Sequence, residues 1–323
     1  MGLQLENLND PGAKGISYTA GFFMLIGFAV AGLLFSGAVG IPIWTAVTGR
    51  SADTFMDVSG TRADTQAVRL IMLISALIAF LAPALLTASV LNRKPMKLLG
   101  FTGSVSARQV VAVLGIAVSA LFVSGFLGWL NEVIPIPEHL RIRFEALEQE
   151  YNRQVVAILG LSNFTDYLVG LLVMAVLPAV CEEALFRGGL QNFLSRATAR
   201  PWLAIIVVSL IFSVAHFSFF GFLPRFVLGI MLGALFHFSG RLWLPILAHF
   251  LNNALAVTIL YVYKLQEKEL EEAVSGTASG WQGVFAVPLL IALLYVFYRI
   301  SRPPAEQPKA VPASEAAKNS HGL

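Results

Sequence analysis

Residues 167–190 read YLVGLLVMAVLPAVCEEALFRGGL, an apolar run that ends in two glutamates and an arginine. Its uncharged part, from Tyr167 to Cys181, is shorter than the roughly 20 apolar residues that a membrane-spanning helix needs. It therefore spans a membrane only if some of the charged residues that follow also lie at membrane depth. A charged side chain at that depth costs several kcal/mol, and such residues mostly serve a function. This stretch thus predicts a membrane helix that carries a functional site.

The whole chain has the composition of a membrane protein. Of its 323 residues, 57% are hydrophobic and 13% are charged, which excludes both a soluble globular domain and a disordered chain. Two shorter apolar runs, 167–181 and 226–240, accompany six that are long enough to cross a bilayer. We therefore expect an all-α, polytopic membrane helix bundle of about eight transmembrane helices. The six long runs are Thr19–Gly49, Leu70–Arg93, Gln109–Asn131, Pro201–Pro224, Leu242–Tyr263 and Ala273–Tyr298.

One connection between the predicted helices has an amphipathic pattern. Within residues 132–166, apolar side chains recur every three or four positions, with charged residues between them. This spacing predicts an amphipathic helix that lies at the membrane interface or packs over the bundle. A covering helix is the simpler interpretation, and a substrate gate is the alternative hypothesis. The apolar positions are Phe144, Leu147, Tyr151, Val155 and Ile158.

The charged residues predict how the chain is oriented in the membrane. Most acidic residues lie in the connections 50–66, 132–166 and 264–272, whereas basic residues follow the alternate helices. By the positive-inside rule we expect both termini in the cytoplasm of a multi-pass membrane protein. The compact chain without organellar targeting favours a bacterial plasma membrane as the location. The net charge of +3 is too small to favour a nucleic-acid partner, and no oligomeric state is predicted. The basic residues are Arg93, Lys94, Lys97, Arg108, Arg187, Arg196, Arg200, Arg299, Arg302, Lys309 and Lys318.

Composition also divides the chain into segments. The first 17 residues lack the basic region of a secretory signal, so the first apolar run is expected to remain as a helix. The single cysteine, Cys181, excludes an internal disulfide and a Cys-rich metal site. The tail is rich in Pro, Ala and charge, which predicts disorder. The predicted segments are a cytoplasmic segment (1–17), N-terminal membrane helices with the amphipathic connection (18–163), a membrane core that carries the site (164–263), the last loop and transmembrane helix (264–300), and the tail (301–323).

The first polar group of the core is Glu182, Glu183 and Arg187. On a helix, Glu183 and Arg187 are four residues apart and can form an ion pair, whereas Glu182 points about 100° away. Arg187 can thus neutralise one carboxylate while the other stays available. Residues that merely mark the cytoplasmic helix end are a weaker explanation, because acids at a helix C-terminus oppose the helix dipole.

Two histidines in the following apolar helices complete the set of candidates. His216 lies in IFSVAHFSFF, four residues after Phe212, and a single histidine on an apolar helix is more often a hydrogen-bonded core residue than a ligand or catalyst. His249 lies in PILAHFLNNAL, where Asn252 and Asn253 fall on or near the same helix face. Polar side chains on a membrane helix need partners, and Glu182 and His216 are the obvious candidates.

A carboxylate, two imidazoles and a carboxamide in one cavity suit hydrolysis. Glu182 could take a proton from water, while His216, His249 and Asn253 orient that water or stabilise an oxyanion. Glu182, His216 and His249 could instead bind a divalent metal such as zinc with an open fourth position. The residues alone do not decide between these two possibilities.

The three groups together resemble a known family. EEALFR matches the Glu-Glu-x-x-x-Arg motif, FSVAH the Phe-x-x-x-His motif and HFLNN the His-x-x-x-Asn motif of the CPBP family of CaaX proteases and bacteriocin-processing enzymes, also called the Abi family. Its eukaryotic members include the Ras-converting CaaX endopeptidase. The resemblance covers about residues 165–260 and rests on all three motifs occurring in order on successive membrane helices.

The resemblance implies an intramembrane endopeptidase that acts on a membrane-associated peptide or protein, either a prenylated CaaX-type protein or a leader peptide. It implies that Glu182 activates the attacking water beside His216, and that His249 and Asn253 bind the water or the oxyanion. Glu183, Arg187 and Phe212 would support the site. The family has been described both as metalloproteases and as metal-independent glutamate proteases, so the metal question stays open. A non-catalytic binding protein, a transporter or a bacteriocin-immunity factor with the same pocket is the alternative.

One difficulty concerns the depth of these residues in the membrane. If one straight helix ended near residue 190 and the next began near 201, Glu182 would lie ~12 Å from the cytoplasmic side and His216 ~22 Å. A shared site would then require a kink, an interfacial segment over 188–203 or a water-filled funnel. Gly188, Gly189 and Pro201 are the expected break points.

Overall fold

The computed structural model describes residues 11–58, 60–267 and 280–301. Within these ranges the chain is helical and contains no strand, which confirms the all-α prediction. Seven helices are long and apolar enough to cross a membrane, and a shorter apolar helix makes an eighth. The segment 1–10, most of the acidic run in 264–272, the start of the last predicted span and the tail after 301 lie outside the described residues.

Several of the seven long helices contain short 3-10 or π segments. The shorter apolar helix is α11 (Pro201–Val214), and α5 (Pro95–Leu98), η2 (Ala52–Thr54) and α7 (Glu138–Leu159) lie in connections. The seven are α2 (Tyr18–Thr48); α3 (Arg62–Ala76), η3 (Leu77–Leu81) and α4 (Ala82–Leu91); α6 (Ala107–Val133); α8 (Phe164–Leu171), η4 (Leu172–Val176), α9 (Leu177–Glu183), η5 (Ala184–Gln191) and α10 (Asn192–Thr198); α12 (Phe222–Ser239); α13 (Trp243–Leu265); and η6 (Gly280–Phe285) with α15 (Ala286–Ser301).

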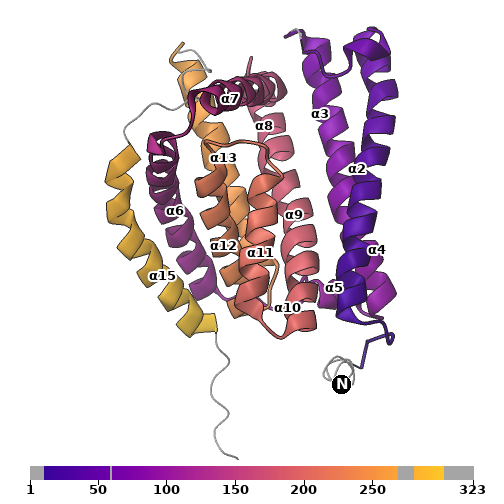
Figure 1. Ribbon diagram of the computed structural model, residues 1–323, viewed down its shortest axis with the longest axis vertical. Coiled ribbons are helices and arrows are strands. Elements are labelled where there is room, and N and C mark those ends of the chain that lie inside the picture. The colour runs from indigo at the N-terminus through magenta and orange to yellow at the C-terminus, as the bar shows by residue number, and fades with distance from the viewer. Residues whose placement is uncertain (1–10, 59, 268–279, 302–323) are drawn as a thin grey trace, which may run out of the picture.

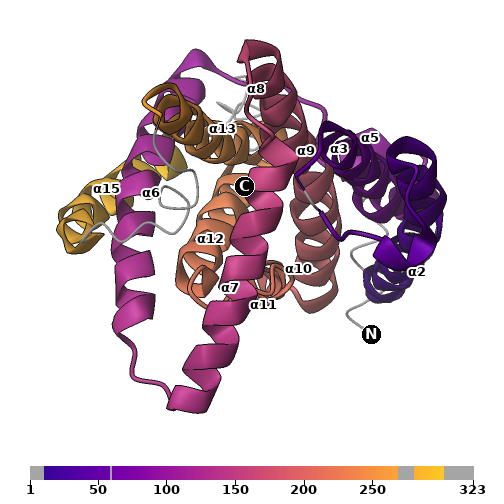
Figure 2. The same ribbon diagram turned by 90° about the horizontal axis from the view of Figure 1, so that it is seen from above.

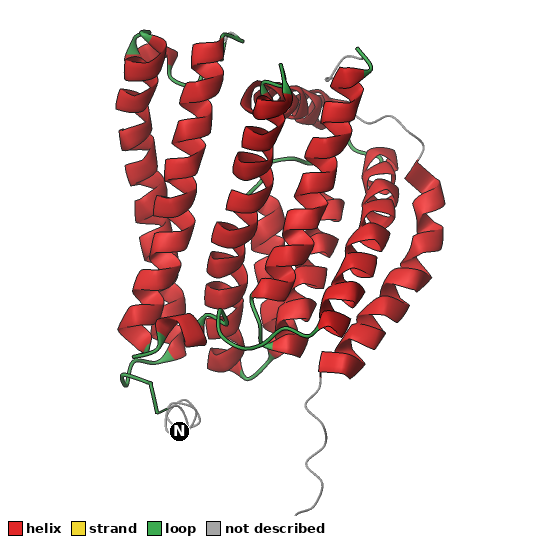
Figure 3. Ribbon diagram, turned by 180° about the vertical axis from the view of Figure 1, so that it is seen from behind, coloured by secondary structure: helices red, strands yellow, loops and turns green. Residues whose placement is uncertain are grey.

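The helices form one bundle in which the segment α8–α10 and helices α11 to α13 occupy the middle. Helices α2 to α4 lie on one side of this central group, and α6 and α15 lie on the other (Figure 1, and from behind in Figure 3). Helix α7 crosses one end of the bundle, as the view from above shows (Figure 2). The residues of the three sequence motifs therefore lie in the central group.

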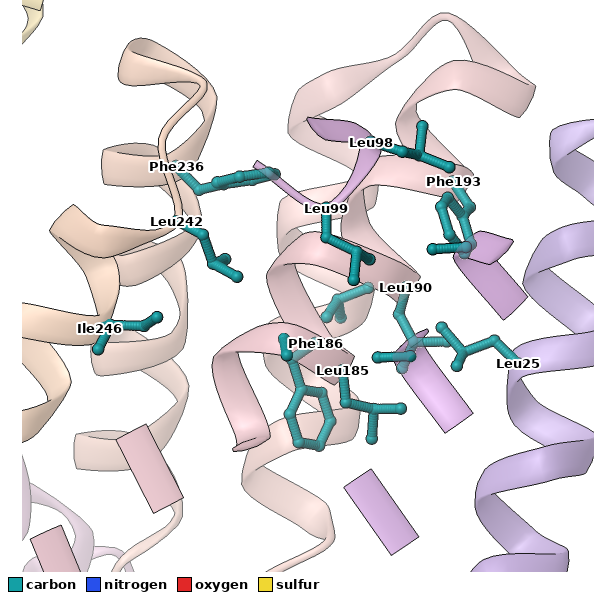
Figure 4. Close-up of a cluster of buried hydrophobic side chains, with 14 of the residues drawn as sticks. Leu25, Leu98, Leu99, Leu185, Phe186, Leu190, Phe193, Phe236, Leu242 and Ile246 are labelled. Carbon is teal, nitrogen blue, oxygen red and sulfur yellow. The ribbon is translucent and has the colours of Figure 1, made fainter. Parts of the chain in front are cut away.

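Two glycines after the Glu-Glu pair allow other elements to pack closely against η5. A Cβ added at Gly188 would lie 2.9 Å from the carbonyl oxygen of Leu99, and one at Gly189 would lie 2.4 Å from a methyl carbon of Leu25. The resulting apolar cluster joins α2, α5 and the central helices (Figure 4). Gly188 and Gly189 thus serve close packing, and they do not break the helix as the sequence suggested.

The long central helix resolves the difficulty over depth. It continues through η5 and α10 as far as Thr198, and the chain turns back at Ala199, which adopts the left-handed conformation, before α11 begins at Pro201. Glu182 lies 16 residues before Thr198 and His216 lies 15 residues after Pro201. At 1.5 Å per residue these separations correspond to ~24 Å and ~22 Å, so both residues lie at similar depth. No kink or interfacial segment is needed.

The helix predicted over Pro201–Pro224 ends earlier than expected, and the helix predicted over 226–240 begins earlier. Helix α11 ends at Val214, a loop spans residues 215–221, and α12 begins at Phe222. Pro224 lies in the first turn of α12, where the backbone N–H groups have no partner within the helix, so proline is tolerated there. In the interior of a continuous helix over 201–224, the same proline would break the helix. Asn131 of α6 holds the loop, because its Nδ2 donates to the Phe219 carbonyl (2.8 Å) and its Oδ1 accepts from the Leu223 N–H (3.2 Å).

Helix α7 is the amphipathic helix that the sequence predicted. One face of it packs on the loop 215–221 and the start of α12, where the Phe144 ring stacks on Phe219 with centroids 4.4 Å apart. Ser218 Oγ donates to Glu148 Oε2 over 2.8 Å. Leu147, by contrast, is exposed. The helix therefore covers the loop that carries His216, and its role as a gate stays a prediction.

A buried arginine fixes the C-terminal end of α7. Arg69 of α3 donates to the carbonyl oxygens of Ile158 and Leu159, and its Nη1 lies 3.1 Å from Oδ1 of Asp166 at the start of α8. Carbonyl groups in the last turn of a helix lack partners within that helix, so the guanidinium satisfies them. The Arg69–Asp166 ion pair thus ties α3, α7 and α8 together.

Candidate active site

The centre of the site is a buried cluster of Glu183, Arg187 and His249. Arg187 Nη1 donates to Glu183 Oε1 over 2.7 Å, and His249 Nδ1 donates to the same oxygen over 2.8 Å. Glu183 and Arg187 are 0% exposed and His249 is 3% exposed. Arg187 Nη2 also donates to the carbonyl oxygen of Gly229 (3.3 Å). The pairing of Glu183 with Arg187 follows the four-residue spacing, whereas Glu183 as the partner of His249 was not foreseen.

Close helix packing makes this cluster possible. A Cβ added at Gly229 of α12 would lie 2.9 Å from Cβ of Ser209 on α11. One helical turn further on, the carbonyl oxygen of Gly233 accepts from Gln191 Nε2 over 2.9 Å. Small residues spaced four apart let helix backbones approach closely in membranes. The glycines of α12 therefore bring backbone carbonyls within reach of side chains on η5.

Glu182 makes none of the hydrogen bonds of this cluster, although it lies close enough to His249, Glu183 and Arg187 to interact with their charges. Its Oε2 atom is buried and has no hydrogen-bond partner among the described residues. Glu183 Oε2 is likewise buried without a partner, but Glu183 Oε1 accepts from both Arg187 and His249, whereas no side chain donates to Glu182 in the described part of the chain. A buried carboxylate oxygen without a hydrogen bond is costly, so its retention favours a chemical role.

Phe212 joins the two histidines to the centre of the site. Its ring centroid lies 4.9 Å from that of His216 and 6.0 Å from that of His249, and the Arg187 guanidinium lies 4.7 Å from it. His216 Nδ1 lies 2.7 Å from the carbonyl oxygen of Phe212 and donates to it. The structure thus gathers all three motifs around Phe212, although no hydrogen bond links Glu182 to His216 among the described residues.

The hydrogen bonds determine which histidine nitrogens are available. In both imidazoles Nδ1–H is used within the protein, by Glu183 and by the Phe212 carbonyl, so the neutral ring offers Nε2 as an acceptor. His216 lies in the loop 215–221 between α11 and α12. A neutral imidazole with a free Nε2 can accept a hydrogen bond from water. It cannot donate one to an oxyanion.

Asn253 has a backbone partner that the sequence did not predict. Its Nδ2 donates to the carbonyl oxygen of Met174 over 3.1 Å, and its Oδ1 accepts from Asn252 Nδ2 over 3.2 Å. Met174 lies four residues before Pro178, which has no N–H to offer that carbonyl. Asn253 therefore supplies the donor that Pro178 lacks, which gives it a structural role in addition to any role in catalysis.

A double-mutant cycle should reveal this coupling. Asn253→Ala removes the side-chain donor to the Met174 carbonyl, and we expect it to lower the free energy of unfolding by about 1–3 kcal/mol. In a Pro178→Ala background a backbone N–H is restored near that carbonyl, so the same substitution should cost at least about 1 kcal/mol less. Thermal unfolding in detergent measures both values, with Asn252→Ala as the control. Equal costs in the two backgrounds would refute the coupling.

The residues proposed as zinc ligands are not arranged for that purpose. Among the described residues there is no group of three or more His, Cys, Asp or Glu side chains that could hold a metal ion. The three side chains do not converge to form such a group, and Glu183 rather than Glu182 is the carboxylate hydrogen-bonded to His249. The possible ligand set Glu182, His216 and His249 does not fit a metal site in this arrangement, and no reaction step is derived through one.

Two polar residues near the site were missed by the sequence analysis. Asn131 holds the loop that carries His216, and Arg225 lies at the start of α12 beside that loop. Both are single polar residues in or beside apolar runs, outside the three motifs. Polar side chains are costly to place at membrane depth, so the sequence alone could have marked both residues as candidates for a functional role. It could not have indicated which groups they contact.

Comparisons with known proteins agree with this site. Residues 164–255 match the family of type II CAAX prenyl endopeptidases described as Rce1-like. An uncharacterized 24.3 kDa protein of Escherichia coli is 35% identical over 91 residues, which are 27% of this chain and 42% of that protein. The uncharacterized protein YpbD of Bacillus subtilis is 30% identical over 110 residues, which are 32% of this chain and 53% of that protein.

The matched region coincides with the site. The chain spans about half of the length of these two curated relatives, and no solved structure matches it. The family match runs from the start of α8 into α13 and so includes Glu182, Glu183, Arg187, His216 and His249. Over its membrane core, residues 164–255, this multi-pass membrane protein is similar to the Rce1-like family of type II CAAX prenyl endopeptidases.

Proposed function

We propose that this chain is an intramembrane endopeptidase in which Glu182 activates the water that hydrolyses a peptide bond of a membrane-associated substrate. The observation that carries the proposal is the difference in hydrogen bonding between the adjacent glutamates. Glu183 Oε1 accepts from Arg187 and His249, whereas no side chain donates to Glu182 among the described residues, and its Oε2 is buried. The family match to membrane endopeptidases supports the same reaction class.

The geometry suggests a role for each group in the reaction. Glu182 takes a proton from water as the water oxygen attacks the scissile carbonyl carbon, and it then passes the proton to the leaving amine. In their neutral forms, His216 and His249 accept hydrogen bonds through Nε2 and so orient the water. Arg187 balances the charge of Glu183, which leaves Glu182 as the base.

Peptide hydrolysis by the purified protein tests this function. The wild-type chain in detergent is incubated with quenched peptides that carry or lack a prenyl group, including leader-type peptides, with and without a chelator. We expect cleavage that the chelator does not abolish. Preference for prenylated peptides would identify a CaaX-type substrate, and preference for unmodified ones a leader-type substrate. No cleavage by well-folded protein would contradict the proposal and favour a binding or immunity role.

We also propose that the end of the bundle opposite α7 faces the cytoplasm. Its described connections and helix ends contain basic residues and no acidic ones, which is the pattern of cytoplasmic loops. The termini would then both be cytoplasmic. The basic residues at this end are Lys14, Arg93, Lys94, Lys97, Arg108, Arg196, Arg200, Arg241 and Arg299.

Cysteine labelling in intact cells measures this orientation. The native Cys181 is 1% exposed and should not react, so single introduced cysteines can be followed. We expect a membrane-impermeant maleimide to label Ser51→Cys, which is at the α7 end, in intact cells. Ser104→Cys, at the basic end, should react only after permeabilisation; both positions are exposed. The reverse labelling pattern would show the opposite orientation.

A further inference from the structure

Phe217, the residue after His216, adopts a backbone conformation that favours glycine. Its φ is +50°, in the left-handed region, where any side chain larger than that of glycine is sterically costly. Of the four non-glycine residues with positive φ in the described part of the chain, it alone adjoins a residue of the three motifs. Backbone strain of this kind is concentrated at functional sites.

The left-handed turn at Phe217 determines where His216 lies. Helix α11 ends at Val214, and the N–H of Phe217 donates to the Val214 carbonyl oxygen over 3.0 Å. His216 is thus the last residue before the chain turns away, with its ring 4.9 Å from that of Phe212. Glycine at 217 would allow the same turn without the steric cost, so the turn by itself does not account for a phenylalanine there.

The side chain of Phe217 has little contact with the rest of the protein. It is 82% exposed, whereas Phe212 is buried and Phe219 stacks on Phe144. An exposed apolar face of a membrane helix lies against lipid. Phe217 therefore lies where such a face of α11 meets the loop that carries His216. Four exposed apolar residues precede it on α11 at intervals of three or four, which is the spacing of one helix face: Leu203, Ile206, Leu210 and Val214.

Lipid contact alone does not explain the phenylalanine. Acyl chains accept apolar residues of any size, and glycine is frequent in membrane helices, so lipid gives no reason for a large side chain where the backbone favours glycine. An aromatic ring is useful where a ligand must be held, because it offers a large, rigid apolar surface. The ligand that suits this place is the substrate of the proposed reaction, which has to reach His216 from the membrane.

The ring of Phe217 can reach only the part of a substrate that lies close to the scissile bond. Adjacent Cα atoms are about 3.8 Å apart, and an extended peptide advances about 3.3 Å per residue. In the proposed reaction His216 orients the attacking water. A group that rests on the next residue, Phe217, therefore belongs to a position within about two residues of the bond that is cleaved.

Resting on the proposed protease function, we infer that Phe217 binds an apolar group of the substrate, within about two residues of the scissile bond, and so selects which peptides are cleaved. The group is an apolar side chain or a lipid attached to the peptide, and either one reaches Phe217 along the lipid-facing side of α11. Because the ring touches the bound peptide and not the reacting atoms, Phe217 is a specificity residue.

Matched quenched peptides test this inference with the full-length protein in detergent. The parent is a peptide that the wild type cleaves, with alanine at the two positions on each side of the scissile bond. Each derivative carries one leucine at one of these positions, or one cysteine that is prenylated or left free. We expect kcat/KM for the best apolar derivative to exceed that of the parent roughly 10-fold, mainly through KM. The derivative that gains most identifies the apolar group as a side chain or a lipid.

Phe217→Gly separates substrate binding from the backbone turn. Glycine adopts the left-handed conformation freely and the exposed ring loses little buried surface, so the unfolding temperature should stay the same or rise. The preference for the apolar peptide should nevertheless fall to less than ~3-fold. Phe217→Leu should keep most of the preference, because the side chain stays apolar. Leu210→Ala, which shortens an exposed side chain on the same face of α11, should keep all of it.

The outcomes separate the inference from the function on which it rests. Wild-type protein that cleaves none of the peptides would refute the protease function itself. Cleavage that does not depend on apolar groups, or a preference that persists in Phe217→Gly, would leave the protease function standing and show that the ring contacts only lipid. A lower unfolding temperature in Phe217→Gly with an equal loss of activity on every peptide would also overturn the inference, because the ring would then support the loop rather than the substrate.

Discussion

Glu182→Gln should abolish peptide hydrolysis while the protein keeps its thermal stability. The substitution preserves the size of the side chain and removes the ability to accept a proton from water. General-base catalysis contributes about 10²- to 10⁴-fold, so we expect kcat/KM to fall at least ~100-fold. Stability should be unchanged because Glu182 Oε2 has no hydrogen-bond partner among the described residues to lose. Hydrolysis of the quenched peptide and thermal unfolding in detergent measure the two quantities.

Glu183→Gln is the matched control, because it changes the adjacent carboxylate. Glu183 Oε1 accepts from both Arg187 and His249, so its neutralisation leaves a buried guanidinium without a counter-charge. We expect this variant to lose stability first, with activity falling as a consequence. Full activity in Glu182→Gln would show that Glu182 is not the base, and an unchanged unfolding temperature in Glu183→Gln would show that the buried pair is not structural.

The sequence predicted the number and class of the helices well but not where two of them end. Apolar runs indicate which segments can enter a bilayer. The seven long helices and one short helix among the described residues agree with the expected bundle of about eight. The ends at Thr198 and Val214 depend on turns and packing instead. Arg196, Asn192 and the glycines of η5 are polar or small, yet they continue the helix because neighbouring elements pack against them or accept their hydrogen bonds.

The candidate site was predicted as a set of residues, but not as a set of contacts. Helical spacing was sufficient to pair Glu183 with Arg187, since both lie on one chain segment. The pairing of His249 with Glu183, and of Asn253 with the Met174 carbonyl, joins segments far apart in the sequence. Spacing within one helix contains no information about such contacts. For the same reason the sequence analysis assigned no role to Arg225 or Asn131.

Arg187→Met should cause the largest loss of stability in the site. It removes the guanidinium and leaves Glu183, which is 0% exposed, with His249 as its remaining side-chain partner. Breaking a buried ion pair by removing one partner typically costs about 3–5 kcal/mol, because a buried charge loses its compensation. We expect a correspondingly lower free energy of unfolding and a lower yield of extractable protein, measured by denaturant or thermal unfolding in detergent.

Removing both charges distinguishes an ion pair from simple packing. The double variant Glu183→Gln/Arg187→Met has no buried charge at this position, so it should regain a large part of the stability that Arg187→Met loses. If the double variant is as unstable as Arg187→Met or less stable, the loss arises from the contacts of Arg187 with Phe212 and the Gly229 carbonyl rather than from its charge. In the described part of the chain, only Glu183 accepts a hydrogen bond from His249 Nδ1. Recovery of stability without recovery of hydrolysis would therefore show that the ion pair also holds His249 in the orientation that the reaction needs.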